Sequence, residues 1–175
     1  MFPSETPPAA EAGRIRPAQR ADVPAMLAIY NDAIRHTTAT YDYEPRMLEQ
    51  RLEWFDEHER DGYPVFVAVD SHDLVVGWSS LSRYHAKPGY RFTVENSVYV
   101  AGEHRGRGWG ARLLAPLIDA AQARGYHAIL AVIDGDNLTS IRLHQRFGFA
   151  EVGRFKEIGF KFDRWLDVVY LERRV

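Results

Sequence analysis

The chain has 175 residues, of which 46% are apolar and 13% aromatic, enough to bury one core of ordinary size. Its 22 basic and 24 acidic residues are interspersed and give a net charge of −2, which argues against a nucleic-acid partner. Cysteine is absent, which excludes disulfides, thiolate nucleophiles and cysteine-ligated zinc.

The first 13 residues are rich in Pro, Ala and Glu, and we expect a flexible extension followed by a single domain over residues 14–175. This extension lacks the apolar segment of a signal peptide. No apolar run approaches the roughly 20 residues that a membrane span needs. The sequence therefore predicts a cytoplasmic protein with no membrane partner.

The N-terminal half predicts a short strand over residues 14–17 and a helix that begins near Asp22 and Pro24. A second helix is predicted from Pro45 onward, with its end at Gly62. Residues 63–69 and 74–82 are apolar or β-branched, and the polar residues between them indicate a hairpin.

A loop over residues 85–90 leads to a strand over residues 93–100. Residues 111–124 carry one apolar stripe and predict a helix, in which Pro116 deletes a backbone hydrogen bond at a cost of about 3 kcal/mol. We therefore expect a bend or a compensating contact there. The remaining elements are predicted as a strand over 127–133, a helix over 137–147, and strands over 149–154 and 168–173. This order predicts a mixed sheet with helices on both faces.

A glycine-rich motif lies between the strand over 93–100 and the helix that follows. It reads Arg105, Gly106, Arg107, Gly108, Trp109, Gly110. Glycines at every second position allow a tight turn with inward N–H groups, and the helix start adds the positive end of its dipole. The motif lacks the Gly-Lys-Ser/Thr of a P-loop and the G-x-G-x-x-G of a dinucleotide fold. It predicts a cradle for phosphate, with a solvated glycine-rich turn as the alternative.

Four segments together resemble the GCN5-related N-acetyltransferase (GNAT) superfamily over about residues 14–172. They are VENSVYV at 94–100, the glycine motif, Asn137 and Ser140 with LHQRFGF at 143–149, and GFK at 159–161 with WLDV at 165–168. The last two look like the phosphinothricin and methionine sulfoximine acetyltransferase branch, whose members use acetyl-CoA to acylate the α-amino group of small amino-acid analogues. The resemblance implies an α/β (α+β) GNAT fold with a mixed, mostly antiparallel sheet. It also implies acetyl-CoA as co-substrate, a small-molecule amine acceptor, a homodimer and no metal.

Acetylating an amine requires a base for the ammonium proton, donors for an oxyanion and a proton for the departing thiolate. Glu95 is a carboxylate in the middle of an apolar strand, on the same face as Ser97 and Tyr99. The resemblance implies that Glu95 is the general base. The alternative is a structural ion pair with Arg91 or Lys87.

His144 stands where many superfamily members place a tyrosine that protonates the leaving sulfur, and where this branch often has histidine. An imidazole can donate a proton near neutral pH, so His144 is predicted as the general acid. The alternative is a packed histidine whose hydrogen bonds are satisfied.

The resemblance distributes the cofactor contacts over three segments. Free backbone groups of residues 98–100, beside a splayed neighbouring strand, would pair with pantetheine. The glycine motif would hold the pyrophosphate, and its arginines would contact the 3′-phosphate or remain solvated. Asn137 would hold the pantetheine or the acetyl end, or else cap its helix. The predicted cofactor-binding residues are Val98, Tyr99, Val100, Arg105, Gly106, Arg107, Gly108, Trp109, Gly110, Ala111, Asn137 and Ser140.

In this branch the loop before the catalytic strand holds the anionic groups of the substrate. The substrate-binding residues predicted here are Lys87, Pro88, Gly89, Tyr90, Phe92 and, after the first helix, Tyr41. Lys87 offers a point charge where an arginine is common, so specificity is expected to differ. The basic residues of this loop favour an anionic acceptor over a polycation. An acetyltransferase for another small amine or a protein N-terminus, and a non-catalytic acyl-CoA sensor, remain alternatives.

Overall fold

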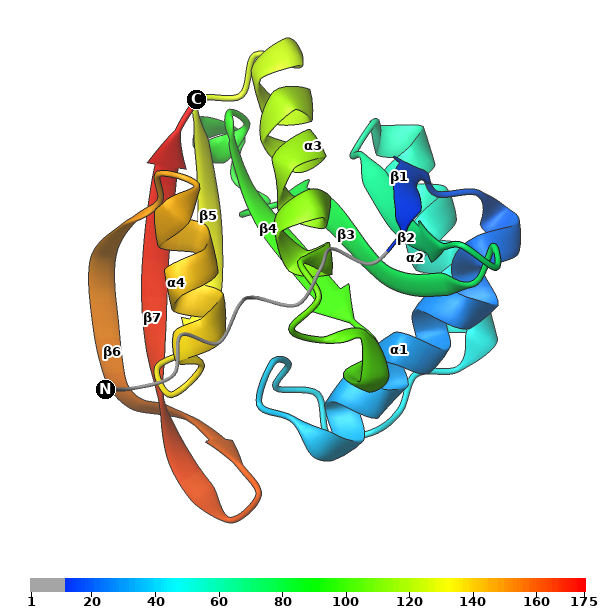
Figure 1. The fold of residues 1–175 in the computed structure, drawn as a ribbon. Coiled ribbons are helices and arrows are strands. Elements are labelled where there is room, and N and C mark those ends of the chain that lie inside the picture. Colours follow the sequence, from blue (N-terminus) through cyan, green and yellow to red (C-terminus); the bar gives the residue numbers. More distant parts are fainter. Residues whose placement is uncertain (1–11) are drawn as a thin grey trace, which may run out of the picture.

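A computed structural model describes residues 12–175 and shows one seven-stranded sheet with four α-helices (Figure 1). The strands are β1 (Gly13–Pro17), β2 (Val65–Asp70), β3 (Val75–Arg83), β4 (Thr93–Val100), β5 (Ala128–Asp134), β6 (Ala150–Lys161) and β7 (Arg164–Arg174). The helices are α1 (Val23–His36), α2 (Leu48–Asp61), α3 (Trp109–Ala123) and α4 (Leu138–Arg146). The predicted flexible extension lies almost entirely outside the described residues.

The strand order is β1-β2-β3-β4-β5-β7-β6, and every neighbouring pair is antiparallel except β4 with β5. That parallel pairing is short, because it joins only residues 93–95 to residues 128–130. Beyond Glu95, β4 pairs with β3 alone, and beyond Leu130, β5 pairs with β7 alone. The two central strands therefore separate, and we call this opening the fork.

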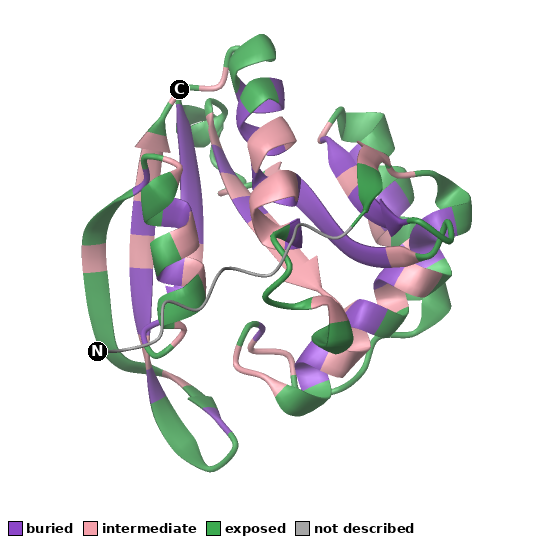
Figure 2. Cartoon of the chain, in the orientation of Figure 1, coloured by how far each residue is buried: buried purple, intermediate pink, exposed green. Residues whose placement is uncertain are grey.

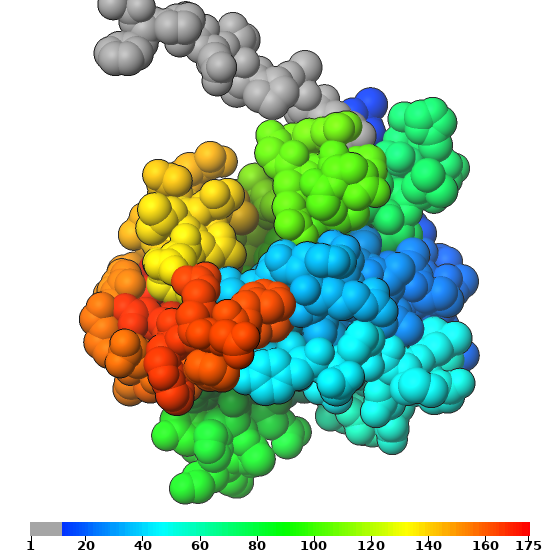
Figure 3. Space-filling model, turned by 90° about the horizontal axis from the view of Figure 1, so that it is seen from below, coloured from blue at the N-terminus to red at the C-terminus, as the bar shows by residue number. Residues whose placement is uncertain are grey.

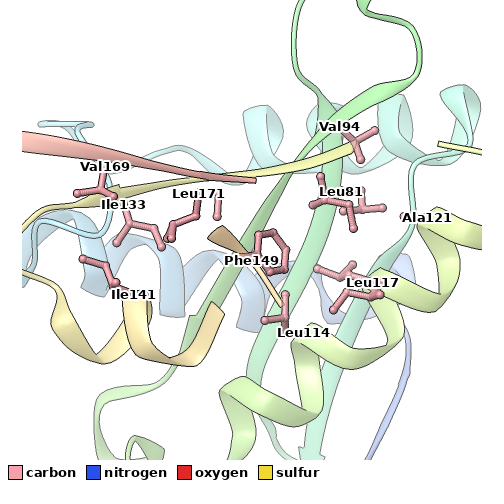
Figure 4. Packing of buried hydrophobic residues seen from close by; sticks show 13 residues of the cluster. Leu81, Val94, Leu114, Leu117, Ala121, Ile133, Ile141, Phe149, Val169 and Leu171 are labelled. Atoms are coloured by element: carbon pink, nitrogen blue, oxygen red, sulfur yellow. The ribbon is translucent and has the colours of Figure 1, made fainter. Parts of the chain in front are cut away.

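Helices cover both faces of the sheet, as predicted. On one face, α1 and α2 pack against β2 and β3 through residues such as Met26, Phe55 and Trp78. On the other face, α3 and α4 pack against β3, β4, β5 and β7, and Figure 4 shows the side chains of this larger cluster interdigitating. The core strands are largely buried, whereas the edge strand β6 is mostly exposed (Figure 2). Helix α3 runs as one element through Pro116.

The element order and types are confirmed, but the bounds of three elements differ from the prediction. Helix α2 begins at Leu48 instead of near Pro45. The Gln50 side chain accepts the Met47 N–H at 2.9 Å and so caps the helix at that point. Strands β6 and β7 extend far beyond the predicted segments and meet at a two-residue turn. Alternation of apolar and polar residues did not predict the full length of the strands, because β6 bulges between Phe155 and Gly159. The Asp167 carboxylate holds this bulge by accepting the Glu157 N–H at 3.1 Å.

Candidate active site

The free edge of β4 lies along the fork. In an antiparallel pair, residues alternate between bonding the partner strand and facing away from it. The Ala101 N–H donates to the Val76 carbonyl at 2.9 Å, so the register places Tyr99 against Trp78 in a hydrogen-bonded pair. The backbone groups of Val98 and Val100 consequently face the fork, where β5 no longer supplies partners. The resemblance implied such a splayed neighbour beside residues 98–100, but the Tyr99 backbone pairs with β3, so only Val98 and Val100 face the opening.

The glycine motif forms the turn between β4 and α3. Gly106 and Gly108 have φ angles of +76° and +84°, a region that favours glycine, and an added Cβ would meet no atom within 4 Å at either position. The glycines are therefore required by backbone conformation and not by crowding. Gly108 caps α3, so the first N–H groups of that helix, including those of Gly110 and Ala111, lack intrahelical acceptors.

Three side chains of the motif behave differently from one another. Trp109 is 1% exposed and packs in the core beside Ala68, so only its backbone is placed to meet a ligand. The Arg105 Nε donates to the Val100 carbonyl at 3.0 Å and ties the loop back to the end of β4. Arg107 is exposed. The motif is thus anchored through Trp109 and Arg105 while its glycines and the α3 N-terminus face outward.

Helix α4 closes the other side of the fork. Its start is capped by Asn137, whose Oδ1 accepts the Ser140 N–H at 3.1 Å. The alternative that Asn137 caps its helix is therefore confirmed. Because its Oδ1 is used in the cap, only its amide nitrogen is left for the predicted contact with the cofactor. A Cβ at Gly110 would lie 3.1 Å from Leu143 Cδ2, which shows how closely the start of α3 approaches the C-terminal half of α4.

His144 points from α4 into the protein and is 3% exposed. Its Nδ1 lies 2.8 Å from the Ser140 carbonyl oxygen and its Nε2 lies 2.9 Å from Asn96 Nδ2, while its ring packs edge-on against Phe149. Burial lowers the pKa of His144, which favours the neutral ring. This geometry supports the alternative of a packed, satisfied histidine, and the acid role stays a prediction.

Glu95 lies in the last residue pair before β4 and β5 separate. Because Val94 packs in the core under α3, strand alternation points Glu95 to the opposite face. Burial raises the pKa of Glu95. Among the described residues, neither Arg91 nor Lys87 forms a salt bridge with it, and the Arg91 guanidinium lies 4.4 Å above the Phe92 ring instead. The ion-pair alternative for Glu95 is therefore wrong.

Tyrosine hydroxyls gather on the same face as Glu95. Burial, with Tyr84 and Glu95 close by, raises the pKa of Tyr170. Burial, together with Asp134 and Tyr170, raises the pKa of Tyr41 to about 12. The Tyr41 hydroxyl is buried without a partner among the described residues. Tyr170 thus lies near both the predicted residue Tyr41 and Glu95. It was not predicted, because it lies within a strand whose sequence is typical of a core strand.

The segment between α1 and α2 reaches across the fork on this face. Thr38 donates to the Asp134 carboxylate at the end of β5, and the Tyr99 hydroxyl donates to the Ala39 carbonyl at 3.3 Å. The Lys161 ammonium, itself 2% exposed, donates to the Thr40 carbonyl at 2.6 Å. In Figure 3 this segment lies beside the β6–β7 hairpin. The segment is therefore held from β4, β5 and β6 at once.

We expect Gly159→Ala to raise the acceptor KM, because its Cβ would lie 2.7 Å from Tyr41 Cε1 and displace that ring. Gly153→Ala on the same strand is the matched control, since its Cβ would meet no atom within 4 Å. Steady-state kinetics and a thermal melt of both variants make the comparison. An unchanged acceptor KM in a folded Gly159→Ala enzyme would remove Tyr41 from the acceptor site.

The loop between β3 and β4 is exposed and held by aromatic contacts. Tyr90 packs edge-on against Tyr84 at 5.5 Å, and the Lys87 N–H donates to His85 Nδ1 at 3.1 Å. Pro88, Gly89 and Tyr90 form one turn of 3-10 helix. Since Tyr84 begins this loop and lies near Tyr170, the loop adjoins the Glu95 face at its base. Phe92 is half exposed.

Residues 12–175 show neither a membrane-spanning helix nor a metal centre. No helix in that range has both the length and the apolar character to cross a membrane. Within the same range, no group of three or more His, Cys, Asp or Glu side chains is arranged to hold a metal ion.

The sheet forks beside a glycine turn, a helix begins at that turn, and a half-buried carboxylate lies at the fork. This combination is typical of acyl-CoA-dependent acyltransferases. Residues 25–149 match the acetyltransferase (GNAT) family, and the chain belongs to that family. The predicted superfamily, fold class and enzyme class are therefore confirmed, and acetyl-CoA is the acetyl donor of the family.

The most similar proteins include amino-acid acetyltransferases. An L-methionine sulfoximine/L-methionine sulfone acetyltransferase of Pseudomonas paraeruginosa is 45% identical over 158 residues, 90% of this chain and 92% of that protein. A phosphinothricin N-acetyltransferase of Streptomyces coelicolor is 41% identical over 91% of this chain and 95% of its own length. The crystal structure of a phosphinothricin acetyltransferase from Sinorhizobium meliloti in complex with acetyl-CoA has a TM-score of 0.91, is 35% identical, and covers 94% of this chain and 89% of its own.

Proposed function

We propose that this protein acetylates the α-amino group of a small amino acid or amino-acid analogue of the phosphinothricin or methionine sulfoximine type. The supporting observation is Glu95, a half-buried carboxylate without an ion-pair partner in the described chain, at the point where β4 leaves β5. Relatives named for methionine sulfoximine and phosphinothricin, aligned over nine-tenths of the chain, support the acceptor class.

The residues present fit acetyl-CoA. The N–H groups of the glycines at positive φ and of the start of α3 are donors that a diphosphate would use. The edge of β4 that β5 leaves free offers backbone groups to an amide-bearing arm, although its Val100 carbonyl already accepts from Arg105 Nε. Residues 106–111 would hold the diphosphate, and the backbone of Val98 and Val100 would pair with the arm. When bound, acetyl-CoA supplies an acyl group activated as a thioester.

Glu95 accepts the proton of the acceptor ammonium in this proposal, directly or through a water molecule. The raised pKa of Glu95 brings it closer to that of the group it must deprotonate, which suits a general base. The backbone N–H groups at the fork are fixed by the sheet and would stabilise developing negative charge without reorganising. Tyr41, Tyr84 and Tyr170 would wall the acceptor on the Glu95 face, with Lys87 in the flanking loop attracting its carboxylate.

A thiol-release assay tests the acceptor class. L-Methionine sulfoximine, L-methionine sulfone and L-phosphinothricin are expected to react, whereas the same compounds blocked at the α-amino group should be inert. Turnover of a diamine with no turnover of any α-amino acid would overturn the proposed acceptor. Binding of acetyl-CoA without turnover of any amine would support the sensor alternative.

We also propose that the protein is a homodimer that pairs through the β6–β7 hairpin. Among residues 12–175, six of the thirteen exposed large apolar side chains belong to this hairpin, which forms an edge of the sheet: Val152, Phe155, Ile158, Phe160, Phe162 and Trp165. Exposed apolar side chains gathered at the edge of a sheet are typical of a protein–protein interface.

Light scattering is expected to give twice the chain mass for the wild type and a monomer for Ile158→Glu. Leu74→Glu, at an equally exposed position in the β2–β3 turn, should remain dimeric. A wild type that stays monomeric at micromolar concentration, or an Ile158→Glu variant that stays dimeric, would contradict pairing through the hairpin.

A further inference from the structure

The side chains of Asn96 and His144 meet at the fork. Asn96 is the first residue of β4 beyond the last pair with β5, and it is 7% exposed. Alternation from Val94 points it to the face covered by α3 and α4, opposite to Glu95. Its Nδ2 lies 2.9 Å from Nε2 of the buried His144. The contact therefore joins β4 to α4 behind the opening.

The proton positions in this pair follow from its surroundings. His144 Nδ1 lies 2.8 Å from the Ser140 carbonyl oxygen, which can only accept, so Nδ1 carries a hydrogen. The ring is neutral because its burial disfavours the charged form, so Nε2 bears a lone pair. That lone pair accepts a hydrogen from Asn96 Nδ2. The reversed amide would set Oδ1 against a lone pair, so His144 fixes which way the amide points.

This orientation leaves one strong acceptor without a donor. Asn96 Oδ1 is buried and has no hydrogen-bond partner within residues 12–175. A buried carbonyl oxygen without a donor costs free energy, and such atoms call for a specific explanation. A ligand that brings an N–H group into the fork would satisfy it.

The face on which Asn96 lies identifies the ligand. The outward N–H groups of α3 and the close approach of Gly110 to Leu143 lie on this face, whereas Glu95 and the tyrosines lie on the other. The group expected here under the proposed function is the pantetheine arm of acetyl-CoA, which carries two amide N–H groups.

We propose that Asn96 is a cofactor-binding residue whose Oδ1 accepts an amide N–H of the pantetheine arm, and that His144 is a positioning residue that holds the Asn96 amide in the accepting orientation. This inference rests on the proposed function for the identity of the ligand. It assigns His144 a fixed tautomer instead of a proton-transfer role.

Calorimetry with coenzyme A tests the contact. Asn96→Ala is expected to weaken binding about 2- to 10-fold, the effect of one hydrogen bond. Asn31→Ala is the matched control, because the Asn31 side chain makes two hydrogen bonds, both to the Arg46 backbone and neither to β4 or α4. The control should bind coenzyme A like the wild type. Wild-type affinity in a folded Asn96→Ala protein would overturn the contact.

Nitrogen-15 NMR of the wild-type histidine rings tests the positioning role without a variant. We expect His144 to show a protonated Nδ1 and a bare Nε2 in neutral buffer, with and without coenzyme A, because burial lowers its pKa. A ring protonated on both nitrogens in neutral buffer, or a proton on Nε2 alone, would overturn the positioning role even if Asn96→Ala fails to fold. If the wild type does not bind coenzyme A, the proposed function fails first, and the tautomer measurement still stands.

Discussion

Glu95→Gln is expected to lower kcat by about 10²- to 10⁴-fold, the contribution typical of general base catalysis, while the Kd for acetyl-CoA stays within about twofold. The carboxylate lies on the opposite face of β4 from the glycine turn and Asn96, so its loss leaves the cofactor contacts in place. Glutamine keeps the shape of the side chain and removes only its ability to take a proton. Steady-state kinetics give kcat, and calorimetry on the same preparations gives the Kd for acetyl-CoA.

The pH dependence supplies a second readout of the same variant. Because burial raises the pKa of Glu95, kcat/KM of the wild type should rise with pH through a value above the ordinary 4.5 and then level off. The variant should lack that rise. For stability the sign is opposite: a raised carboxyl pKa means that ionisation destabilises the folded state as pH increases past the unfolded value. Glu95→Gln should therefore be at least as stable as the wild type at pH 7.

Glu53→Gln is the matched control, since Glu53 is an exposed carboxylate on α2. It should keep the wild-type kcat and pH profile. A Glu95→Gln enzyme that retains more than about a tenth of the wild-type kcat would exclude Glu95 as the base. In that event an uncharged acceptor amine reaching the site from bulk solvent would be the simplest explanation.

Short-range patterns predicted the part of the site that lies on one stretch of chain. Strand alternation placed Glu95 and Val94 on opposite faces, and the spacing of glycines anticipated the positive φ angles at Gly106 and Gly108. These features depend on a period of two or on a residue without a Cβ, both of which are visible in the sequence.

Contacts between distant segments could not be predicted in the same way. Tyr170 and Lys161 reach the site because β6 and β7 fold back against the segment after α1, which is more than one hundred residues away. Lys161 was marked only as part of the GFK segment of the resemblance, and nothing local marks Tyr170 as different from a core residue. Likewise, the pairing of Asn96 with His144 appears only when α4 packs beneath the fork.

Trp109 was predicted to contact the cofactor, but its side chain packs in the core. Its place in the glycine motif predicted a cofactor contact, yet its indole is 1% exposed and packs with Ala68, Val76 and Leu113. Because Trp109 is the first residue of α3, its burial fixes where the helix starts and which way the preceding glycines turn. Cofactor binding and folding stability are therefore expected to depend on the same side chain.

Trp109→Ala is accordingly expected to lower the free energy of unfolding by about 3–5 kcal/mol, the usual cost of removing a large buried aromatic. Urea unfolding of the wild type and the variant measures this loss. Leu74→Ala is the control, since Leu74 is 62% exposed and its truncation should stay within about 0.5 kcal/mol. The remaining folded Trp109→Ala protein should also bind acetyl-CoA more weakly, because the start of α3 would no longer be held against β2 and β3. If the folded fraction binds with wild-type affinity, the glycines and Arg105 alone hold the turn, and the core anchor matters only for stability.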